Sequence, residues 1–274
     1  MSAATNKKNE TGNQLRKGLY ALLERIGSSA FAALNEVGGV LIITWEIFKR
    51  LIPPRMDRKE TWRSFYRDGV QSFGIVVVTA VLVGAIMVIQ AAGYIENYGA
   101  YSLLGWGAGF SILREVGPIL IGLMFSGRVG ANNTAELGTM KVTEQVDALR
   151  ALAIDPISYL VVPRFVSMII MMVLLVVIGD LTAILGGALT ADILIGVSPQ
   201  LFFSSLLEYT YLMDFLSGVI KAGAFGFAIA VVSCYYGMSV KGGAVGVGRA
   251  VNDSVVATAV GIFVLDYVLT YMMA

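Results

Sequence analysis

Long stretches of the chain contain almost no ionisable side chain. Residues 69–95 contain none, and a helix of roughly 20 apolar residues already crosses the ~30 Å hydrocarbon core of a membrane. Four further apolar segments each contain one ionisable residue or one pair, at about 104–127, 165–188, 215–238 and 254–273. The pattern therefore predicts an all-α integral membrane protein with five transmembrane helices.

A shorter apolar stretch, residues 37–48, precedes these segments. It contains Glu46 and is followed by two basic residues and two prolines. This length and polarity are more typical of an interfacial helix lying on the membrane than of a sixth span. We divide the chain into a polar N-terminal segment, an interfacial or cytoplasmic helical region, and a transmembrane domain: residues 1–30, 31–68 and 69–274.

The composition supports a membrane protein and narrows its chemistry. Only 14% of the residues are charged and 57% are hydrophobic, whereas soluble domains have about 25% charged residues. This argues against a soluble enzyme and against a nucleic-acid-binding protein. The chain has no histidine and one cysteine, Cys234, which excludes histidine-based catalytic and zinc sites and an intrachain disulfide.

The positions of the basic residues predict the orientation of the spans. Twelve of the 20 Lys and Arg residues precede residue 68, four lie in 128–164 and two in 238–253, while 93–103 and 189–214 contain none. Basic residues accumulate in cytoplasmic loops. We therefore expect the N-terminus in the cytoplasm and the C-terminus on the opposite side.

The loop between the second and third predicted spans contains a candidate amphipathic helix at about 133–154. Asn133 and Glu136 resemble an N-cap and its third-position acid, and Asp155 before a proline supplies a stop. Apolar residues recur with helical spacing at Val142, Val146, Leu149 and Ala153. The helix could be a solvated connector packed on the bundle or an element that receives motion from a soluble subunit. The pattern alone does not choose between these.

The same region resembles a known family. The run LREVGPILIGLMFSGRVGANNTAELGTMKVTEQVDALRALAIDPISYLVVPR, with the later GVGRA and LDYVLTYMM motifs, is similar to the signature region of the MlaE/YrbE-type permeases. These are the membrane subunits of MCE-associated ABC lipid transporters. The resemblance covers about residues 30–274. One departure is Asp253, which stands where family members often place a second basic residue.

The resemblance implies a fold, a function and a set of partners. It implies an interfacial helix, five spans and a cytoplasmic coupling helix, in a permease of the bacterial inner membrane with a periplasmic C-terminus. Two copies would enclose a phospholipid cavity, with two cytoplasmic ABC ATPases, a periplasmic MCE-domain protein, expected as a hexamer, and a small STAS-type subunit as further partners. The chain lacks a Lys-Ser/Thr pair after a glycine loop, so we expect no cofactor here and ATP on the partner subunit.

Charged residues inside predicted spans are the candidate functional residues, because a charge at membrane depth is costly without a partner. Arg114, Glu115 and Lys221 are predicted to form a polar ring that receives an anionic lipid headgroup, with Glu115 as the counter-ion of Lys221. Asp266 matches a family position near the subunit contact. The candidate ATPase-coupling residues lie in the loop described above: Glu136, Lys141, Glu144, Asp147 and Arg150.

Two other functions remain open at this stage. An intramembrane enzyme could use Glu115, Asp180 or Asp266 as acid and base groups, although no nucleophile with a recognisable base accompanies them. An uncoupled channel or an assembly scaffold would need no ATPase. The sequence specifies neither the direction of transport nor the lipid.

Overall fold

The computed structural model describes residues 27, 31, 34–51, 58–99 and 101–273, and for residues 58 and 94–98 it describes the backbone alone. The chain divides into two units, residues 1–45 and 46–274, and each is described by itself. The described residues form helices and no strand. The predicted all-α fold is confirmed.

Five helical passes are long and apolar enough to cross a membrane, which confirms the predicted number of spans. The first pass consists of α2 (Arg58–Phe65), the π-turn η1 (Tyr66–Val70) and α3 (Gln71–Tyr98). The second consists of η2 (Tyr101–Leu103), α4 (Leu104–Ser111), η3 (Ile112–Val116), α5 (Gly117–Phe125), η4 (Ser126–Gly130) and α6 (Ala131–Val142). The third consists of η5 (Ile157–Val161), α8 (Val162–Thr190) and η6 (Ala191–Ile195), and α10 (Leu212–Met238) and α11 (Gly243–Met273) complete the set.

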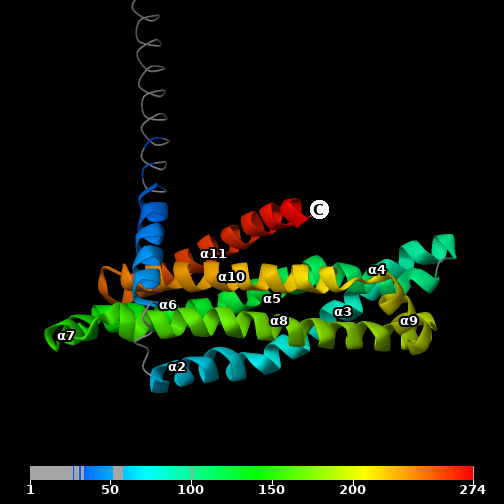
Figure 1. The fold of residues 1–274 in the computed structure, drawn as a ribbon, viewed down its shortest axis with the longest axis horizontal. Coiled ribbons are helices and arrows are strands. Elements are labelled where there is room, and N and C mark those ends of the chain that lie inside the picture. The colour runs from blue at the N-terminus through cyan, green and yellow to red at the C-terminus, as the bar shows by residue number, and fades with distance from the viewer. Residues whose placement is uncertain (1–26, 28–30, 32–33, 52–57, 100, 274) are drawn as a thin grey trace, which may run out of the picture. The chain divides into compact units, whose positions relative to one another are not determined.

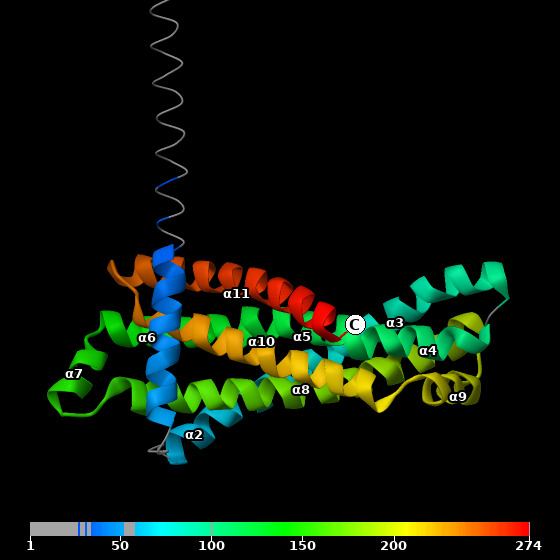
Figure 2. The ribbon, with the colours of Figure 1, turned by 45° about the horizontal axis from the view of Figure 1, so that its top comes forward.

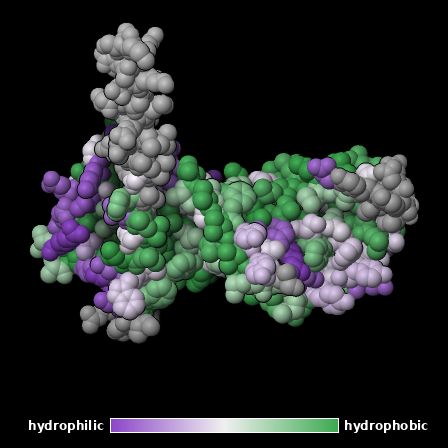
Figure 3. All heavy atoms as spheres, turned by 90° about the horizontal axis from the view of Figure 1, so that it is seen from above, coloured by the Kyte–Doolittle hydropathy of each residue, from purple (hydrophilic) through white to green (hydrophobic). Residues whose placement is uncertain are grey.

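The passes alternate in direction along one long axis (Figures 1 and 2). The short helix α7 (Gln145–Ala151) lies at one end of this bundle, and α9 (Pro199–Tyr209) lies at the other. Figure 3 shows hydrophilic surface gathered at the end where Figure 1 places α7, hydrophobic surface over the middle, and a second group of polar residues toward the other end. A hydrophobic belt between polar ends is what a lipid bilayer requires of a spanning bundle.

Small residues let the first and third passes approach closely. A side-chain carbon added at Gly84 in α3 would overlap the carbonyl oxygen of Ala183 in α8, and one added at Gly186 would overlap the backbone of Val81. Helices in a membrane associate largely by such close packing, because lipid tails are as apolar as the side chains. These glycines therefore set the distance between α3 and α8.

Replacing Gly84 by Ala is expected to lower the thermal midpoint of the purified protein in detergent. The obstacle is backbone, so α3 and α8 must separate, at a cost of about 1–3 kcal/mol for overpacking. Gly74→Ala on the same helix is the matched control, because nothing lies within 4 Å of its added carbon. Equal midpoints for the two variants would contradict this packing.

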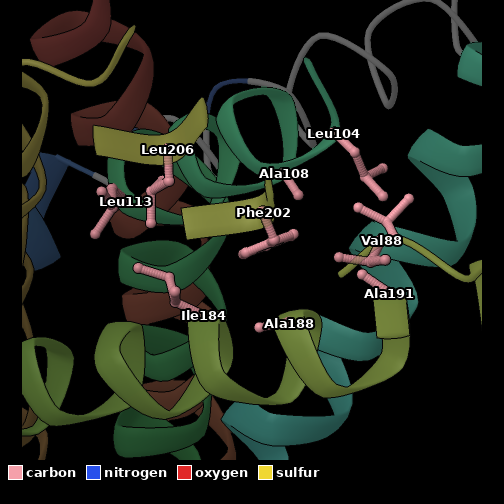
Figure 4. Packing of buried hydrophobic residues seen from close by; sticks show 10 residues of the cluster. Val88, Leu104, Ala108, Leu113, Ile184, Ala188, Ala191, Phe202 and Leu206 are labelled. Carbon is pink, nitrogen blue, oxygen red and sulfur yellow. The ribbon is translucent and has the colours of Figure 1, made fainter. Parts of the chain in front are cut away.

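A cluster of buried apolar side chains fixes α9 against the spans. Val88, Leu104, Ala108 and Phe202 are each at most 1% exposed, and Leu206 is 7% exposed. Figure 4 shows these side chains converging from α3, α4 and α9. The loop that includes α9 is thereby a rigid part of the bundle.

The predicted interfacial helix is present as a helix, residues 34–51. Within the first unit, its exposed large apolar side chains are Leu34, Val37, Leu41, Ile42 and Trp45. Such exposure suits a lipid-facing surface. Its placement on the membrane stays a prediction. The predicted boundary at residue 30 falls among residues outside the described ranges.

The structure corrects the predicted coupling helix at 133–154. The helix of the second pass continues through α6 to Val142, and only α7 forms a separate short helix beyond it. Asn133 is fully buried inside α6 and is not an N-cap, because its side chain bonds to other helices. Of the predicted apolar stripe only Val146 is fully buried, while Val142 remains 36% exposed.

Candidate functional site

The second pass is interrupted where its charged residues lie. At the π-turn η3, the Gly117 N–H bonds to the carbonyl oxygen of Ile112, one residue further back than in an α-helix. Pro118 follows, and it has no N–H to donate to the preceding turn. The Arg114 carbonyl instead accepts a hydrogen bond from Lys221 Nζ at 3.0 Å. The sequence thus opens the helix at the site where a lysine from α10 enters.

Lys221 is fully buried and surrounded by acceptors. Its Nζ lies 2.5 Å from Glu115 Oε2 and 3.0 Å from Asp266 Oδ1, and it donates to Thr270 Oγ1 at 2.7 Å. The predicted ion pair between Glu115 and Lys221 is therefore present. Two carboxylates and a hydroxyl compensate the cost of burying the ammonium group.

Arg114 faces a different neighbourhood. Its Nη1 lies 3.5 Å from Asp214 Oδ1, its Nη2 donates to the Met273 carbonyl at 3.0 Å, and its guanidinium lies 5.5 Å from the ring centroid of Phe110. The Arg114 side chain is 23% exposed, and it borders a cavity of about 390 Å³. The other residues lining this cavity are Met213, Asp214, Leu216, Ser217, Ile220, Met272 and Met273.

The two cations therefore differ in what they can bind. Lys221 has no exposed surface within one copy of the chain, so it serves there as the counter-ion of Glu115 and Asp266. Arg114 has a partly open guanidinium at a mostly apolar cavity, and its ion pair with Asp214 is at the distance limit of a hydrogen bond. Of the predicted ring, Arg114 is the residue that can receive an anionic group.

The structure adds two residues to this site that the sequence reasoning missed. Asp214 accepts a hydrogen bond from the Tyr211 N–H at 2.9 Å at the start of α10. An acidic residue immediately before a predicted span, where a helix begins, was the available signal. Thr270 lies one helical turn beyond Asp266 and donates toward Glu115 at 3.3 Å. A threonine in an apolar span gives a weaker signal.

Asp180 is the third carboxylate that the sequence offered as an acid or base group. It lies in the middle of α8 and is 2% exposed, so it does not end a helix. Its Oδ1 has no hydrogen-bond partner among the described residues. A side chain at Gly117 would overlap this carboxyl oxygen. Asp180 therefore packs against the opened turn of the second pass without an ion pair.

The predicted coupling residues cluster around α7. Asp147 forms ion pairs with Lys141 at 3.4 Å and with Arg150 at 2.8 Å. Glu144 and Ala153, which flank the helix, both have a φ of 59°. This conformation is unusual for residues other than glycine, so both turns around α7 are sharp. The exposed charged residues therefore lie on or next to a short helix that is bounded by a sharp turn at each end.

Glu136 is placed differently from the other predicted coupling residues. It is bonded by Arg67 at 2.5 Å, by Arg164 at 3.1 Å and by Asn132 at 3.0 Å. Behind it lies a buried polar network that sequence reasoning missed, in which Asn133 donates to Ser233 at 2.9 Å. These bonds fasten α6 to the first, third and fourth passes.

Arg50 and Asp155 form an ion pair next to this region. Partial burial alone raises the pKa of Asp155, but hydrogen bonds from Ser158 and Arg50, with the charge of Arg50, outweigh it and hold the pKa below its ordinary value. A carboxyl with a lowered pKa stabilises the fold above its unfolded pKa and loses this effect as the pH falls through its folded pKa. The pair is therefore fully formed at neutral pH.

Five apolar passes that enclose a buried charge cluster, with a cavity lined by Arg114, are features of a polytopic membrane protein. The profile of the MlaE permease family matches residues 61–272. The chain belongs to this family of ABC transporter permeases. Membership makes it a transport subunit rather than an intramembrane enzyme, and it implies ATPase subunits and a second permease copy as partners.

Three relatives illustrate the breadth of the family. A probable ABC transporter permease protein of Rickettsia conorii is 35% identical over 252 residues, which are 92% of this chain and 97% of the relative. One from Synechocystis is 35% identical over 84% of this chain and 88% of the relative. The chloroplastic protein trigalactosyldiacylglycerol 1 of Arabidopsis thaliana is 32% identical over 84% of this chain and 66% of the relative.

Proposed function

We propose that this chain is the permease subunit of a phospholipid transporter in the bacterial inner membrane. Two copies would form a lipid-binding cavity, and ATP hydrolysis on two cytoplasmic ATPases would drive lipid transfer to or from a periplasmic MCE-domain protein. The observation on which the proposal rests is the partly open guanidinium of Arg114 at a cavity lined mainly by methionine and aliphatic side chains. A phospholipid complements both features, because its anionic headgroup can pair with the guanidinium and its acyl chains can pack against the apolar lining.

The relatives support a lipid as the transported substrate. The Arabidopsis relative is named after trigalactosyldiacylglycerol, which is a glycolipid. Methionine side chains adapt to irregular apolar partners, and Met213, Met272 and Met273 all line the cavity beside Arg114. In this proposal they accommodate acyl chains while Arg114 binds the headgroup phosphate.

The orientation follows from charge. In the described second unit, the basic residues other than Arg114 and Lys221 belong to segments before α3, around α6–α7 or at the α10–α11 turn. Because basic residues accumulate in cytoplasmic loops, this distribution supports a cytoplasmic α7 and a periplasmic C-terminus. The ATPases would then bind α7, with a small STAS-type subunit as a further cytoplasmic partner.

The second copy would cover the exposed apolar face of α11. Only 11% of the apolar window of this helix is buried within one chain. Large exposed side chains follow this face: Val256, Val260, Phe263, Val264 and Tyr267. Asp266 lies on the same helix, so pairing of two α11 helices would bring the two charge clusters near each other.

Arg114→Gln is expected to weaken binding of an anionic phospholipid about tenfold, which corresponds to about 1.4 kcal/mol. The measurement is labelling by a photoreactive phosphatidylglycerol in proteoliposomes, followed by mapping of labelled peptides around Met213 and Met272. Lys241→Gln is the control, because it removes an exposed positive charge outside the cavity. Unchanged labelling at those peptides in Arg114→Gln would overturn the proposed role.

A further inference from the structure

A polar hollow of about 870 Å³ opens in the part of the bundle near α6 and α7, remote in sequence from the Arg114 cavity. Its walls come from α2, η1, the first residue of α3, α6, the first residue of α7, η5 and α8. A smaller hollow of about 230 Å³ shares Arg67, Gln71 and Asn132 with it and adds Ser72 and Arg128. The two hollows have no lining residue in common with the cavity at Arg114.

Four arginines from four separate segments line these hollows: Arg63, Arg67, Arg128 and Arg164. Three carboxylates line them as well, from Glu60, Asp68 and Glu136. Asp68 bonds to Arg67 at 3.1 Å, and Glu136 pairs with both Arg67 and Arg164. Within the described ranges, Arg63 and Arg128 have no ion pair. The four arginines outnumber the three carboxylates by one, so the lining has a formal net charge of +1. The two arginines without an ion pair are also the more exposed ones.

Three donor groups on these walls are buried without an acceptor. They are Arg67 Nη2, Arg164 Nε and Ser72 Oγ, for which no partner exists in the part of the chain that the structure describes. Arg164 is only 4% exposed and Ser72 only 2%. A buried donor left unsatisfied costs about 1–3 kcal/mol, and more when it is charged. Arg67 lines both hollows, Arg164 lines the larger and Ser72 the smaller. Three such donors around two adjoining hollows point to a missing partner with several acceptor oxygens.

A phosphate group fits this demand. It has several acceptor oxygens and a negative charge, and guanidinium groups bind it with paired hydrogen bonds. The segment that forms one wall also exposes Trp62, Val70 and Phe73, which are 76%, 59% and 47% exposed. Such apolar exposure next to a polar hollow suits a ligand whose phosphate continues into acyl chains.

We propose that the hollow between α2–η1 and η4–α6 is a second anion site, which binds the phosphate group of a membrane phospholipid through Arg67, Arg164 and the freer arginines Arg63 and Arg128. The proposal goes beyond the transport function and does not depend on it, because it rests on the charge, volume and unpaired donors of this hollow. It assigns to Arg128 and Arg164 a ligand contact that the coupling role of the neighbouring α7 does not require.

Native mass spectrometry of the purified full chain tests this site. The titrations use the Arg114→Gln variant, in which lipid binding at the Arg114 cavity is weakened. Binding that remains can then be assigned to the second site, so the two proposals are tested separately. The probes are phosphatidylglycerol, diacylglycerol with the same acyl chains, and inorganic phosphate. We expect phosphatidylglycerol to bind and diacylglycerol to bind at least tenfold more weakly.

Arg63→Gln and Arg128→Gln are expected to weaken phosphatidylglycerol binding about tenfold each. Thermal stability should not fall, because neither residue forms an ion pair with another described residue. Lys241→Gln should bind like the background. Equal binding of phosphatidylglycerol and diacylglycerol, or no effect of either arginine variant, would overturn the site. Inorganic phosphate that binds as tightly as the lipid, with the same arginine dependence, would overturn the lipid assignment.

Ser72→Ala gives an independent check. If the hollow holds no ligand, removal of an unsatisfied buried hydroxyl is neutral or stabilising. If the hydroxyl binds the phosphate, the variant loses thermal stabilisation by added phosphatidylglycerol. We expect the loss, and retention of the full stabilisation would contradict the proposal.

Discussion

Lys221→Met is expected to destabilise the folded protein by about 3 kcal/mol or more. Lys221 is completely buried, and its ammonium is the ion-pair partner of both Glu115 and Asp266. Removal of one partner of a buried ion pair leaves uncompensated charge, which typically costs about 3–5 kcal/mol. The measurement is the thermal midpoint of the purified protein in one detergent, followed by tryptophan fluorescence and size-exclusion chromatography.

A neutralised triple variant separates charge from packing. Lys221→Met combined with Glu115→Gln and Asp266→Asn removes the stranded charges, so it should recover a large part of the lost stability. Lys241→Met, at an exposed lysine, is the matched control and should behave like the wild type. A Lys221→Met protein as stable as Lys241→Met would show that the ammonium does not hold η3, α10 and α11 together.

Asp147→Ala is expected to stop ATP-driven lipid transfer while leaving the fold intact. Asp147 on α7 is 50% exposed, and it pairs with Lys141 at the end of α6 and with Arg150 on α7. Exposed ion pairs contribute about 1 kcal/mol or less to stability, so the thermal midpoint should not change measurably. Binding of an ATPase subunit to α7 depends on these charges in our proposal, so the variant should lose more than tenfold in transfer.

The control for this variant is Asp192→Ala. Asp192 is also exposed, and it lies in η6 at the end of the bundle opposite α7. It should retain normal transfer and normal stimulation of the ATPase. Equal transfer by the two variants would contradict the assignment of α7, whereas a lowered thermal midpoint in Asp147→Ala would mean that the charges stabilise the fold.

The number of spans could be predicted from the sequence, because it depends on the length of apolar segments and on the positions of basic residues. Apolar length fixes whether a helix can cross the membrane, and the sorting of basic residues fixes which loops share a side. The ion pair of Glu115 with Lys221 was also predictable. Glu115 and Lys221 are charged residues in apolar spans, and each lies at a similar depth from the end of its span. A charge at that depth needs a partner, so the two could be expected to pair.

The end of the second pass was not predictable in the same way. Asn133 is typical of a helix N-cap when only its neighbours in sequence are considered. Its amide instead bonds to Ser233, and its carbonyl oxygen accepts from Arg164 at 3.0 Å. These partners lie 100 and 31 residues away along the chain. Tertiary bonds therefore keep a polar, cap-like residue inside a continuous helix, and local pattern cannot record them.

The different surroundings of Arg114 and Lys221 could not be predicted from the sequence either. Sequence reasoning treated Arg114 and Lys221 alike, since both are single positive charges in apolar segments. The π-turn η3 and Pro118 direct them to different surroundings, and Asp214, which was not among the candidates, occupies the cavity edge beside Arg114. The geometry of an interrupted helix, rather than its composition, decides which cation faces the cavity.

The central claim is that ATP hydrolysis on partner subunits moves phospholipid through this chain. The most direct measurement is fluorescent phosphatidylglycerol transfer between proteoliposomes that contain this chain with its ATPase subunits and liposomes that display the MCE-domain protein. We predict transfer that requires ATP and falls about tenfold with Arg114→Gln, while Lys241→Gln transfers normally. ATP hydrolysis without lipid movement, or lipid movement that is independent of both ATP and Arg114, would contradict the account.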